Sequence, residues 1–366
     1  MMTLEKPDEQ KPHKPKPAKH KTGPTRLSTP ARAVRGLSLA YLGLTIAATV
    51  VLWSDWGNEW WGTLLRFLPH HPFLIVPAAL LVGSLFIHRR SFVINLTCLA
   101  CIVGPLMGFR LPLWNLVFGK PVEPGLLVVS CNVQQFEPDF RSLLEEITVL
   151  QPDVVALQEA LAENELLNRS FPGWHAVHEG EFWVLSRFPV TRLDTCHSVP
   201  FQRETALSVR IDAPSGSFVL HNLHLTTVRH GLSLLNVDSI VDGSGPFELE
   251  QQSQWREIEA EETRAYVEKI GYEQPILVLG DFNTPTYGRG YRASWSDFTN
   301  AFDEAGFGFG YTAPCVRRRF WPDYQPWVRI DHILSDPRWS VSECDVGWGN
   351  GSDHRLIWAR LVPQAH

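Results

Sequence analysis

The 366-residue sequence lacks an excess of positive charge. Lys and Arg number 33 against 39 Asp and Glu, which gives a formal net charge of −6 at pH 7. A protein dedicated to long nucleic acids usually carries a basic surface, so this balance weighs against that class, although a local basic cleft is compatible with it. Hydrophobic residues make up 44% of the chain, which predicts a sizeable packed core.

Cysteine is scarce, and its spacing lacks the pattern of a zinc site. Cys98 and Cys101 form a CxxC pair in an apolar stretch with no second pair and no paired histidines nearby. We interpret these two thiols as helix-packing or lipid-facing groups rather than metal ligands. The remaining four would be able to form disulfides in an oxidising compartment, in a pairing that the spacing does not define. They are Cys131, Cys196, Cys315 and Cys344.

The first 35 residues have almost no large apolar side chains and carry nine Lys or Arg against three acids. Such a segment cannot bury enough surface to fold alone, so residues 1–35 are predicted to be a disordered basic tail. Contact of this tail with anionic lipid headgroups is the alternative. Residues 36–53 then form an uncharged run with no small-x-small cleavage site after it, which favours a retained membrane anchor over a signal peptide.

Two further apolar runs, at 72–87 and 92–109, predict a membrane region over residues 36–110 with about three transmembrane helices. The tail and the basic turn at 88–90 should both be cytoplasmic. This reasoning predicts a multi-pass protein of the cell (inner) membrane whose chain is exocytoplasmic after residue 109. The second run is short and contains two prolines, so a two-span topology with the opposite orientation stays open.

From residue 124 onward the pattern changes to short β-rich runs bounded by turns and interleaved with helices. This order predicts an α/β sandwich of two packed sheets, preceded by the transmembrane helices, with a catalytic domain over 124–366. Helices are expected at 140–150 and 252–270. Strands are expected at 126–133, 153–158, 182–186, 206–211, 217–225, 275–282, 329–335 and 356–362.

Polar side chains stand at the ends of several predicted strands, in the segments LQE, GDFN, RIDH and GSDH. Taken singly, each could be a cap, a turn residue or a satisfied core histidine. Taken together they would bury several charges, which is costly unless a metal or a partner compensates them. The donors are mostly oxygens, which suits Mg²⁺ or Mn²⁺ better than zinc or copper. The candidates are Asn132, Glu159, His224, Asp281, Asn283, Asp331, Asp353 and His354.

In order and spacing these motifs resemble those of the endonuclease/exonuclease/phosphatase superfamily, whose fold is that of deoxyribonuclease I. The resemblance spans about residues 124–364 and implies a magnesium-dependent phosphatase or phosphodiesterase. It also implies that Glu159 is the principal Mg²⁺ ligand, assisted by Asn132 and Asp353. The matching segments are SCNVQQF, ALQEA, VLSRFPV, NLHL, LGDFNTP, RIDHILS and GSDHRLI.

The same resemblance implies roles for the five candidate catalytic residues. Asp281 and Asn283 would position or activate the attacking water and hold the phosphate. His354 would act as a base or stabilise the phosphoryl oxygens, oriented by Asp331. His224 would contact the phosphate or protonate the leaving group.

The substrate is not defined by the fold, because this fold serves nucleases, lipid phosphodiesterases and phosphatases alike. The membrane region and a similarity to the membrane-anchored bacterial branch associated with glycopeptide-antibiotic resistance imply a lipid-linked phosphate or pyrophosphate, such as polyprenyl pyrophosphate. A nuclease and a catalytically inactive membrane-attached binding module are the alternatives. Residues 228–250 are interpreted as a membrane-facing lid or a plain surface loop. Arg317, Arg318 and Arg319 are candidates for binding a diphosphate or nucleic-acid phosphates.

Overall fold

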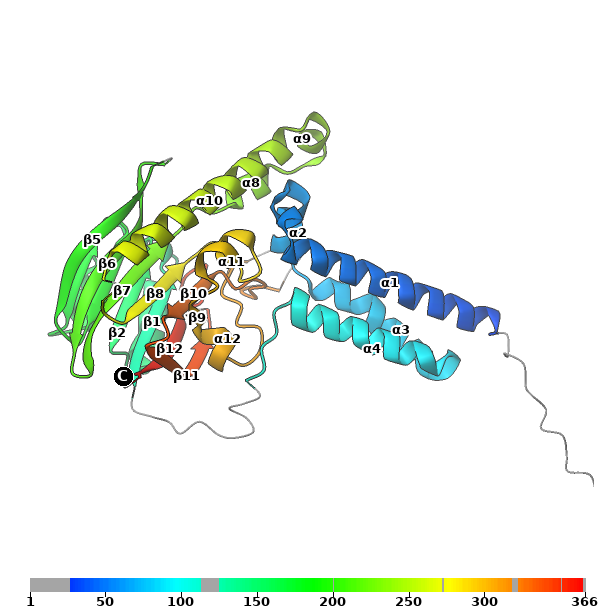
Figure 1. Ribbon diagram of the computed structural model, residues 1–366, viewed down its shortest axis with the longest axis horizontal. Helices are drawn as coiled ribbons and strands as arrows, with labels where there is room; N and C mark the ends of the chain where they lie inside the picture. The colour runs from blue at the N-terminus through cyan, green and yellow to red at the C-terminus, as the bar shows by residue number, and fades with distance from the viewer. Residues whose placement is uncertain are drawn as a thin grey trace, which may run out of the picture.

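The computed structural model describes residues 27–112, 125–199, 201–271, 273–317, 322–349 and 351–364, with the backbone alone at 57 and 58. From residue 125 onward the chain forms two six-stranded sheets packed face to face and flanked by helices, which confirms the predicted α/β sandwich (Figure 1). The first sheet has the order β11-β12-β1-β2-β4-β3. Its strands are β1 Leu126–Asn132, β2 Val154–Gln158, β3 His175–Glu179, β4 Phe182–Ser186, β11 Trp339–Val346 and β12 Ile357–Pro363.

The second sheet has the order β5-β6-β7-β8-β10-β9. All eight predicted strands are present, with ends that differ by up to three residues from the prediction. The sequence reasoning missed β3, β5, β9 and β11, which have more polar or shorter patterns. The strands of the second sheet are β5 Val190–Ser198, β6 Arg203–Ala213, β7 Gly216–His224, β8 Ile276–Asp281, β9 Thr299–Asn300 and β10 Asp331–Ser335.

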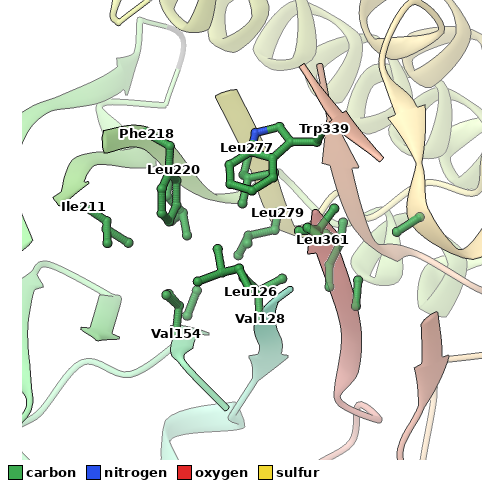
Figure 2. Packing of buried hydrophobic residues seen from close by; sticks show 14 of the residues in the cluster. Leu126, Val128, Val154, Ile211, Phe218, Leu220, Leu277, Leu279, Trp339 and Leu361 are labelled. Atoms are coloured by element: carbon green, nitrogen blue, oxygen red, sulfur yellow. The ribbon is translucent and has the colours of Figure 1, made fainter. Parts of the chain in front are cut away.

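The main core lies between the two sheets. Side chains alternate along each strand with a period of two, so Leu126 and Val128 of β1 share one buried cluster with Leu277 and Leu279 of β8 (Figure 2). Each such fully buried side chain contributes roughly 1.5–3 kcal/mol relative to an exposed one. The core therefore fixes which face of every strand points inward, and with it the direction of the polar residues at the strand ends.

Helices cover the outer faces of the sandwich. The amphipathic helix α6 (Phe140–Val149) begins at Asp139, whose side chain accepts a hydrogen bond from the backbone N–H of Ser142, and it packs on the outer face of β1 and β2. Helix α10 (Ser244–Lys269) packs on the outer face of the second sheet. The shorter helices and turns are η4 Gln134–Phe136, α7 Glu165–Ser170, α11 Arg289–Trp295 and α12 Ala301–Ala305.

Residues 228–250, interpreted from the sequence as a lid or a loop, are largely helical. They form α8 (Arg229–Leu234), α9 (Val237–Asp242) and the beginning of α10, which starts eight residues before the predicted first residue, 252. A capping box stabilises α9, because the Asn236 side chain accepts from the Ser239 N–H and the Ser239 hydroxyl accepts from the Asn236 N–H. This local signal outweighs the turn-like composition of the segment, so the expectation of a loop is wrong.

The N-terminal segment contains two helices long and apolar enough to cross a membrane. One is α1 (Thr29–Trp53), and the other spans Arg89–Leu106 and comprises α4 (Arg89–Cys101) and the π-helical turn η3 (Ile102–Leu106). Helix α1 begins at Thr29 rather than at residue 36, because a proline in its first turn and the following Ala and Arg residues favour a helix. The rest of the predicted tail, residues 1–26, lies outside the described residues.

A third span depends on how a bent segment is counted. Helix α2 (Trp60–Phe67) meets the run formed by η2 (His71–Leu74) and α3 (Ile75–Ile87) at an angle of 80°. Helices α1, α3 and α4 lie side by side and project away from the sandwich (Figure 1), while α2 packs on α10. The short turn η1 (Asp55–Asn58) connects α1 to α2. The number of spans and the topology stay predictions.

The six cysteines are free thiols, so the possibility of a disulfide among the domain cysteines is not realised in this structure. Cys98 is buried between the N-terminal helices, where its Sγ lies 3.2 Å from the Thr45 hydroxyl. This position agrees with the interpretation of the CxxC pair as helix-packing thiols.

Candidate active site

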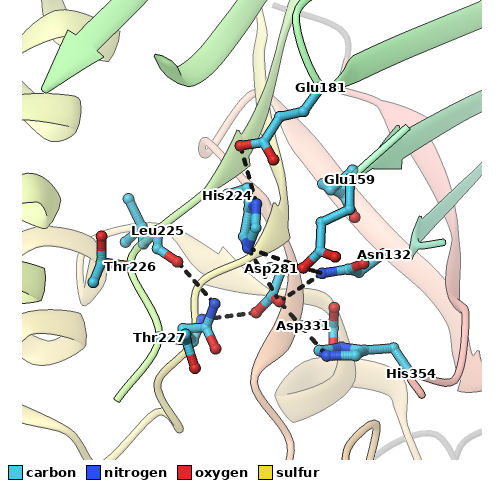
Figure 3. A network of polar contacts seen from close by, with 12 residues as sticks. Asn132, Glu159, Glu181, His224, Leu225, Thr226, Thr227, Asp281, Asp331 and His354 are labelled. Carbon is cyan, nitrogen blue, oxygen red and sulfur yellow. Dashed lines mark hydrogen bonds and ion pairs between the residues drawn. The ribbon is translucent and has the colours of Figure 1, made fainter. Parts of the chain in front are cut away.

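Strand register places four predicted site residues at one edge of the sandwich. On the second sheet, His224 of β7 pairs with Asp281 of β8, and Asp281 pairs with Asp331 of β10. On the first sheet, Asn132 ends β1. Each of these residues continues the inward-facing alternation of its strand, so the same periodicity that builds the apolar core directs the four polar groups toward one another (Figure 3).

A layer of amides separates this edge from the apolar core. The Gln158 Nε2 donates to the Asn222 Oδ1 at 2.6 Å and to the Ser130 hydroxyl at 3.1 Å, and the Asn222 Nδ2 donates to the Leu157 carbonyl at 2.9 Å. All three polar side chains are fully buried. Because buried polar groups destabilise a fold unless they are hydrogen-bonded, this connected layer gives the charged groups above it a rigid base.

Asp331 and His354 form a buried pair, as the sequence predicted. The Asp331 Oδ2 lies 2.9 Å from the His354 Nδ1, and the His354 Nε2 lies 3.7 Å from the Asp281 Oδ2. Burial alone would lower the pKa of His354, but the carboxylates of Asp331 and Asp281 raise it to about 10. His354 is therefore an imidazolium at neutral pH.

His224 is held from the opposite side by Glu181, which the sequence reasoning missed. The His224 Nδ1 lies 3.1 Å from the Glu181 Oε1, and the Arg203 Nη2 donates to the same oxygen at 3.1 Å and to the His224 carbonyl at 2.7 Å. Burial lowers the pKa of His224, but the hydrogen bond and the charge of Glu181, together with Asp281, raise it above its usual value. Glu181 precedes β4 in a hairpin turn, where nothing in the sequence marks it.

Glu159 follows β2 and links the two sheets through Asn132. The Asn132 Nδ2 donates to the Glu159 Oε1 at 2.8 Å and to the Asp281 Oδ2 at 3.1 Å. The Glu159 side chain is 32% exposed and its backbone has a φ of 54°. Positive φ at a non-glycine residue costs on the order of 1–3 kcal/mol and persists where the surroundings hold it; here the Gln135 N–H donates to the Glu159 carbonyl at 2.9 Å.

Asn283 is the second predicted site residue with positive φ, at 48°. Its N–H donates to the Asp281 Oδ1 at 2.8 Å, and its Nδ2 donates to the Leu225 carbonyl at 2.8 Å. The buried Arg256 of α10 donates from Nη1 to the Asn283 carbonyl at 2.7 Å, and its guanidinium lies 5.6 Å from the ring centroid of Phe67 in α2. The strained loop at Asn283 is thus supported by α2 of the N-terminal segment through Arg256.

Asp353 lies beside this network but hydrogen-bonds to residues outside it. Its Oδ2 accepts from the Arg229 Nη2 at 2.9 Å, and its N–H donates to the Gln134 Oε1 at 3.1 Å. The Gln134 N–H in turn donates to the Asn132 Oδ1 at 3.0 Å. Asp353 is therefore connected to the site through the loop after β1, whereas its role as a metal ligand stays a prediction.

The composition of the cluster fits a divalent cation. Five carboxylates face four cationic groups, and the buried Asp331 Oδ1 has no hydrogen-bond partner among the residues that the structure describes. Asp281, Asp331 and His354 bring ligand-type atoms within 4.8 Å of one another, and His354 would have to lose its proton to serve as a ligand. Most of the donors in the cluster are oxygens, which suit Mg²⁺ or Mn²⁺. The carboxylates are Glu159, Glu181, Asp281, Asp331 and Asp353, and the cations are Arg203, His224, Arg229 and His354.

Of the basic stretch at 317–319, Arg317 donates from Nε to the Tyr324 hydroxyl at 3.0 Å. Arg318 and Arg319 lie outside the described residues. Phosphate binding by this stretch stays a prediction.

Comparisons with known proteins find matches to the part of the chain that forms the sandwich. The sequence profile of the Endonuclease/Exonuclease/phosphatase family matches residues 129–354, which is more than half of the chain. No curated protein sequence matches this chain. Among solved structures, an endonuclease/exonuclease/phosphatase family protein from Bacteroides thetaiotaomicron aligns with a TM-score of 0.50 and 15% identity, covering 66% of this chain and 99% of that chain.

Two other solved structures align at slightly lower scores. A mannosyl-6-phosphatase from Bacteroides thetaiotaomicron has a TM-score of 0.49 at 16% identity and covers 65% of this chain and 99% of its own. An AP endonuclease from Archaeoglobus fulgidus has a TM-score of 0.47 at 16% identity and covers 66% of this chain and 100% of its own. At such identities the likeness concerns the fold and not the substrate.

Proposed function

Because this chain belongs to the endonuclease/exonuclease/phosphatase family, we propose that it is a divalent-metal-dependent hydrolase that cleaves a phosphate or pyrophosphate ester of a membrane lipid. The observation that carries the proposal is the position of the site: the buried network around Asp281 lies beside the loops that contact α2 of the N-terminal segment. Polyprenyl pyrophosphate is the lipid substrate that we would test first.

The chain's own residues would divide the chemistry between them. The His354 imidazolium donates a hydrogen bond to a phosphoryl oxygen as negative charge develops there. Asp281 accepts a proton from the attacking water, because burial and the neighbouring Asp331 raise its pKa. His224, whose pKa is raised by Glu181 and Asp281, donates a proton to the leaving oxygen. A divalent cation bound by Glu159 and its neighbours would supply Lewis-acid charge to the same oxygens.

Contacts between the catalytic loops and the N-terminal helices support a lipid substrate. Tyr287, four residues after Asn283, donates from its hydroxyl to the Arg66 carbonyl at 3.3 Å. Trp327, four residues before Asp331, donates from Nε1 to the Phe67 carbonyl at 2.9 Å. The loops that flank Asn283 and Asp331 therefore contact the segment next to the predicted membrane spans, which favours a substrate that reaches the site from the bilayer.

An exposed apolar patch on α9 and the start of α10 also supports the lipid proposal. Val237, Val241 and Phe247 are 77%, 82% and 64% exposed. In Figure 1, α9 extends from the sandwich toward the same side as α2. Clustered apolar side chains at the end of a helix are a feature of surfaces that contact the bilayer interface.

The proposal is tested with the purified full chain in detergent and Mg²⁺ or EDTA. We expect phosphate release from polyprenyl pyrophosphate with Mg²⁺, none with EDTA, and loss of activity in Glu159→Gln. Glu165→Gln is the matched control, because Glu165 is an exposed surface carboxylate. Faster cleavage of DNA than of the lipid would establish a nuclease instead, and inactivity on lipids, soluble phosphoesters and DNA would indicate a binding module.

A further inference from the structure

A cavity of about 300 Å³ lies between the ends of the apolar helices and the active-site edge of the sandwich. One wall is formed by Trp53, the last residue of α1, and by residues 104–110, which follow α4. The opposite wall is formed by residues 285–287 and 327–329, the segments adjoining the Asn283 loop and Asp331. The volume is at the lower end of the range for small-molecule sites, about 300–1,000 Å³.

The wall of the cavity is aromatic. Phe309 packs edge-on against Phe109 with ring centroids 5.2 Å apart and stacks on Tyr311 at 5.1 Å. Trp53 lies 6.1 Å from Tyr287, ring to ring. These side chains come from both the helical segment and the sandwich, so an apolar ligand in the cavity would contact both parts of the molecule.

The cavity is also lined by a buried guanidinium, that of Arg329, whose hydrogen-bonding capacity is not filled by the residues that the structure describes. Arg110 donates from Nε and Nη2 to the two carboxylate oxygens of Asp303, at 2.8 and 2.9 Å, and Arg329 donates from Nη2 to the same carboxylate. Two guanidinium groups therefore share one acid. The Arg329 side chain is buried, and its Nη1 has no hydrogen-bond partner among the residues that the structure describes. A buried donor without an acceptor costs roughly 1–3 kcal/mol.

We propose that this cavity binds an anionic phospholipid of the bilayer, with the phosphate accepting from Arg329 and the first part of the apolar chain against the aromatic wall. The unpartnered donor of Arg329 selects an anion, and the aromatic lining selects an amphiphile over a free ion. The position of the cavity, at the ends of both helices that are able to cross a membrane, selects a lipid. The inference rests on the proposed membrane placement and is independent of which phosphoester the enzyme cleaves.

A glycine in the wall provides a test. A Cβ built on Gly104 meets no atom within 4 Å, and Gly104 lines the cavity, so Gly104→Leu should fill it without a clash. Gly83 in α3 is equally open but does not line the cavity, so Gly83→Leu is the matched control. Each full-length variant is placed in nanodiscs of phosphatidylcholine alone or with added phosphatidylglycerol, and retained lipid is counted by native mass spectrometry.

The wild type and Gly83→Leu should retain phosphatidylglycerol and show a raised melting temperature in its presence. Gly104→Leu should bind it at least about tenfold more weakly, which corresponds to about 1.4 kcal/mol, with an unchanged melting temperature in phosphatidylcholine alone. Equal retention by Gly104→Leu and wild type would overturn the proposal.

Two arms keep the result interpretable. If Gly104→Leu does not fold, the test rests on the wild type alone. A phospholipid site is refuted if the wild type retains phosphatidylglycerol no better than phosphatidylcholine. It is also refuted if inorganic phosphate in phosphatidylcholine discs raises the melting temperature as much as phosphatidylglycerol does. Release of phosphate from polyprenyl pyrophosphate by the wild type with Mg²⁺ is measured in parallel. Its absence would count against the proposed function and leave the lipid-binding result unaffected.

Discussion

Because of the charges around His354, the single variant His354→Ala should lose more stability than the double variant Asp331→Asn/His354→Ala. Both Asp331 and Asp281 are fully buried, and the imidazolium of His354 lies between them, 2.9 Å and 3.7 Å from their nearest oxygens. In His354→Ala the two carboxylates face each other without this cation. In the double variant Asp331→Asn/His354→Ala one of the two negative charges is also gone.

The magnitude follows from the pKa of His354, which rises from 6.5 to about 10. One pKa unit corresponds to about 1.4 kcal/mol, so the carboxylates favour the imidazolium by on the order of 5 kcal/mol. Removing one partner of a buried ion pair typically costs about 3–5 kcal/mol. We expect a loss of this size for His354→Ala, a loss of about 1–3 kcal/mol for Asp331→Asn, and a smaller loss for the double variant than for His354→Ala.

The assay is a double-mutant cycle on the full chain in detergent with EDTA, so that bound metal does not mask the charges. Unfolding is followed by circular dichroism, and kcat/KM is measured separately with Mg²⁺. The two activity losses should also be non-additive, because the residues act as one unit. The half-exposed pair Glu343–Arg360, 3.0 Å apart, is the control and should give a coupling of at most about 1 kcal/mol. Additive losses at the buried pair, or a double variant less stable than His354→Ala, would refute the reasoning.

Three further predictions concern the supports of the site and its orientation. Arg256→Met should lower kcat by roughly 10- to 100-fold, because a charge-assisted hydrogen bond to the Asn283 carbonyl contributes about 1.5–3 kcal/mol; Arg256→Lys should restore part of the rate, and an unchanged kcat in Arg256→Met would contradict the role. Burial would raise the pKa of Asp303, but Arg329 and Arg110 lower it to about 2, so its stabilisation of about 2 kcal/mol is present above pH 4 and is lost as the pH falls toward 2. The difference in melting temperature between wild type and Asp303→Asn should shrink over this interval, and a constant difference would argue against the linkage. Finally, a reporter active only outside the cytoplasm should be active when fused after residue 366 and inactive after residue 90; activity in the reverse pattern would mean that residues 72–87 do not span.

The convergence of four candidate site residues could be predicted from the sequence, because their positions follow from strand periodicity; their roles stay predictions. Asn132, His224 and Asp281 each end a strongly apolar strand on its inward face, so a correct assignment of the strands directs all three to the same edge. Asp331 occupies the first position of β10 for the same reason. The pairing of Asp331 with His354 is confirmed, although Asp331 begins β10 of the second sheet and His354 lies in the loop before β12 of the first.

The partners of these residues were not predictable in the same way. Glu181 and Arg256 approach the site from a hairpin turn and from the middle of a helix, and each meets its partner across a long stretch of sequence. Nothing in the local pattern distinguishes them from other acidic or basic side chains. The capping box at Asn236 was visible in the sequence, but an apolar, glycine-containing segment favoured a loop over the short helices that form.

The sequence pattern changes at residue 124, but side chains before and after this position pack against one another. The Thr63 hydroxyl lies 3.1 Å from the Ser253 hydroxyl in a buried contact between α2 and α10, and Phe67 packs on Val328 and Ile330 beside the catalytic loops. Without α2 these apolar residues would be exposed and Arg256 would lose the ring that covers it. Helix α2 is therefore part of the structure that holds the candidate site, because it covers the arginine that supports the strained Asn283 loop.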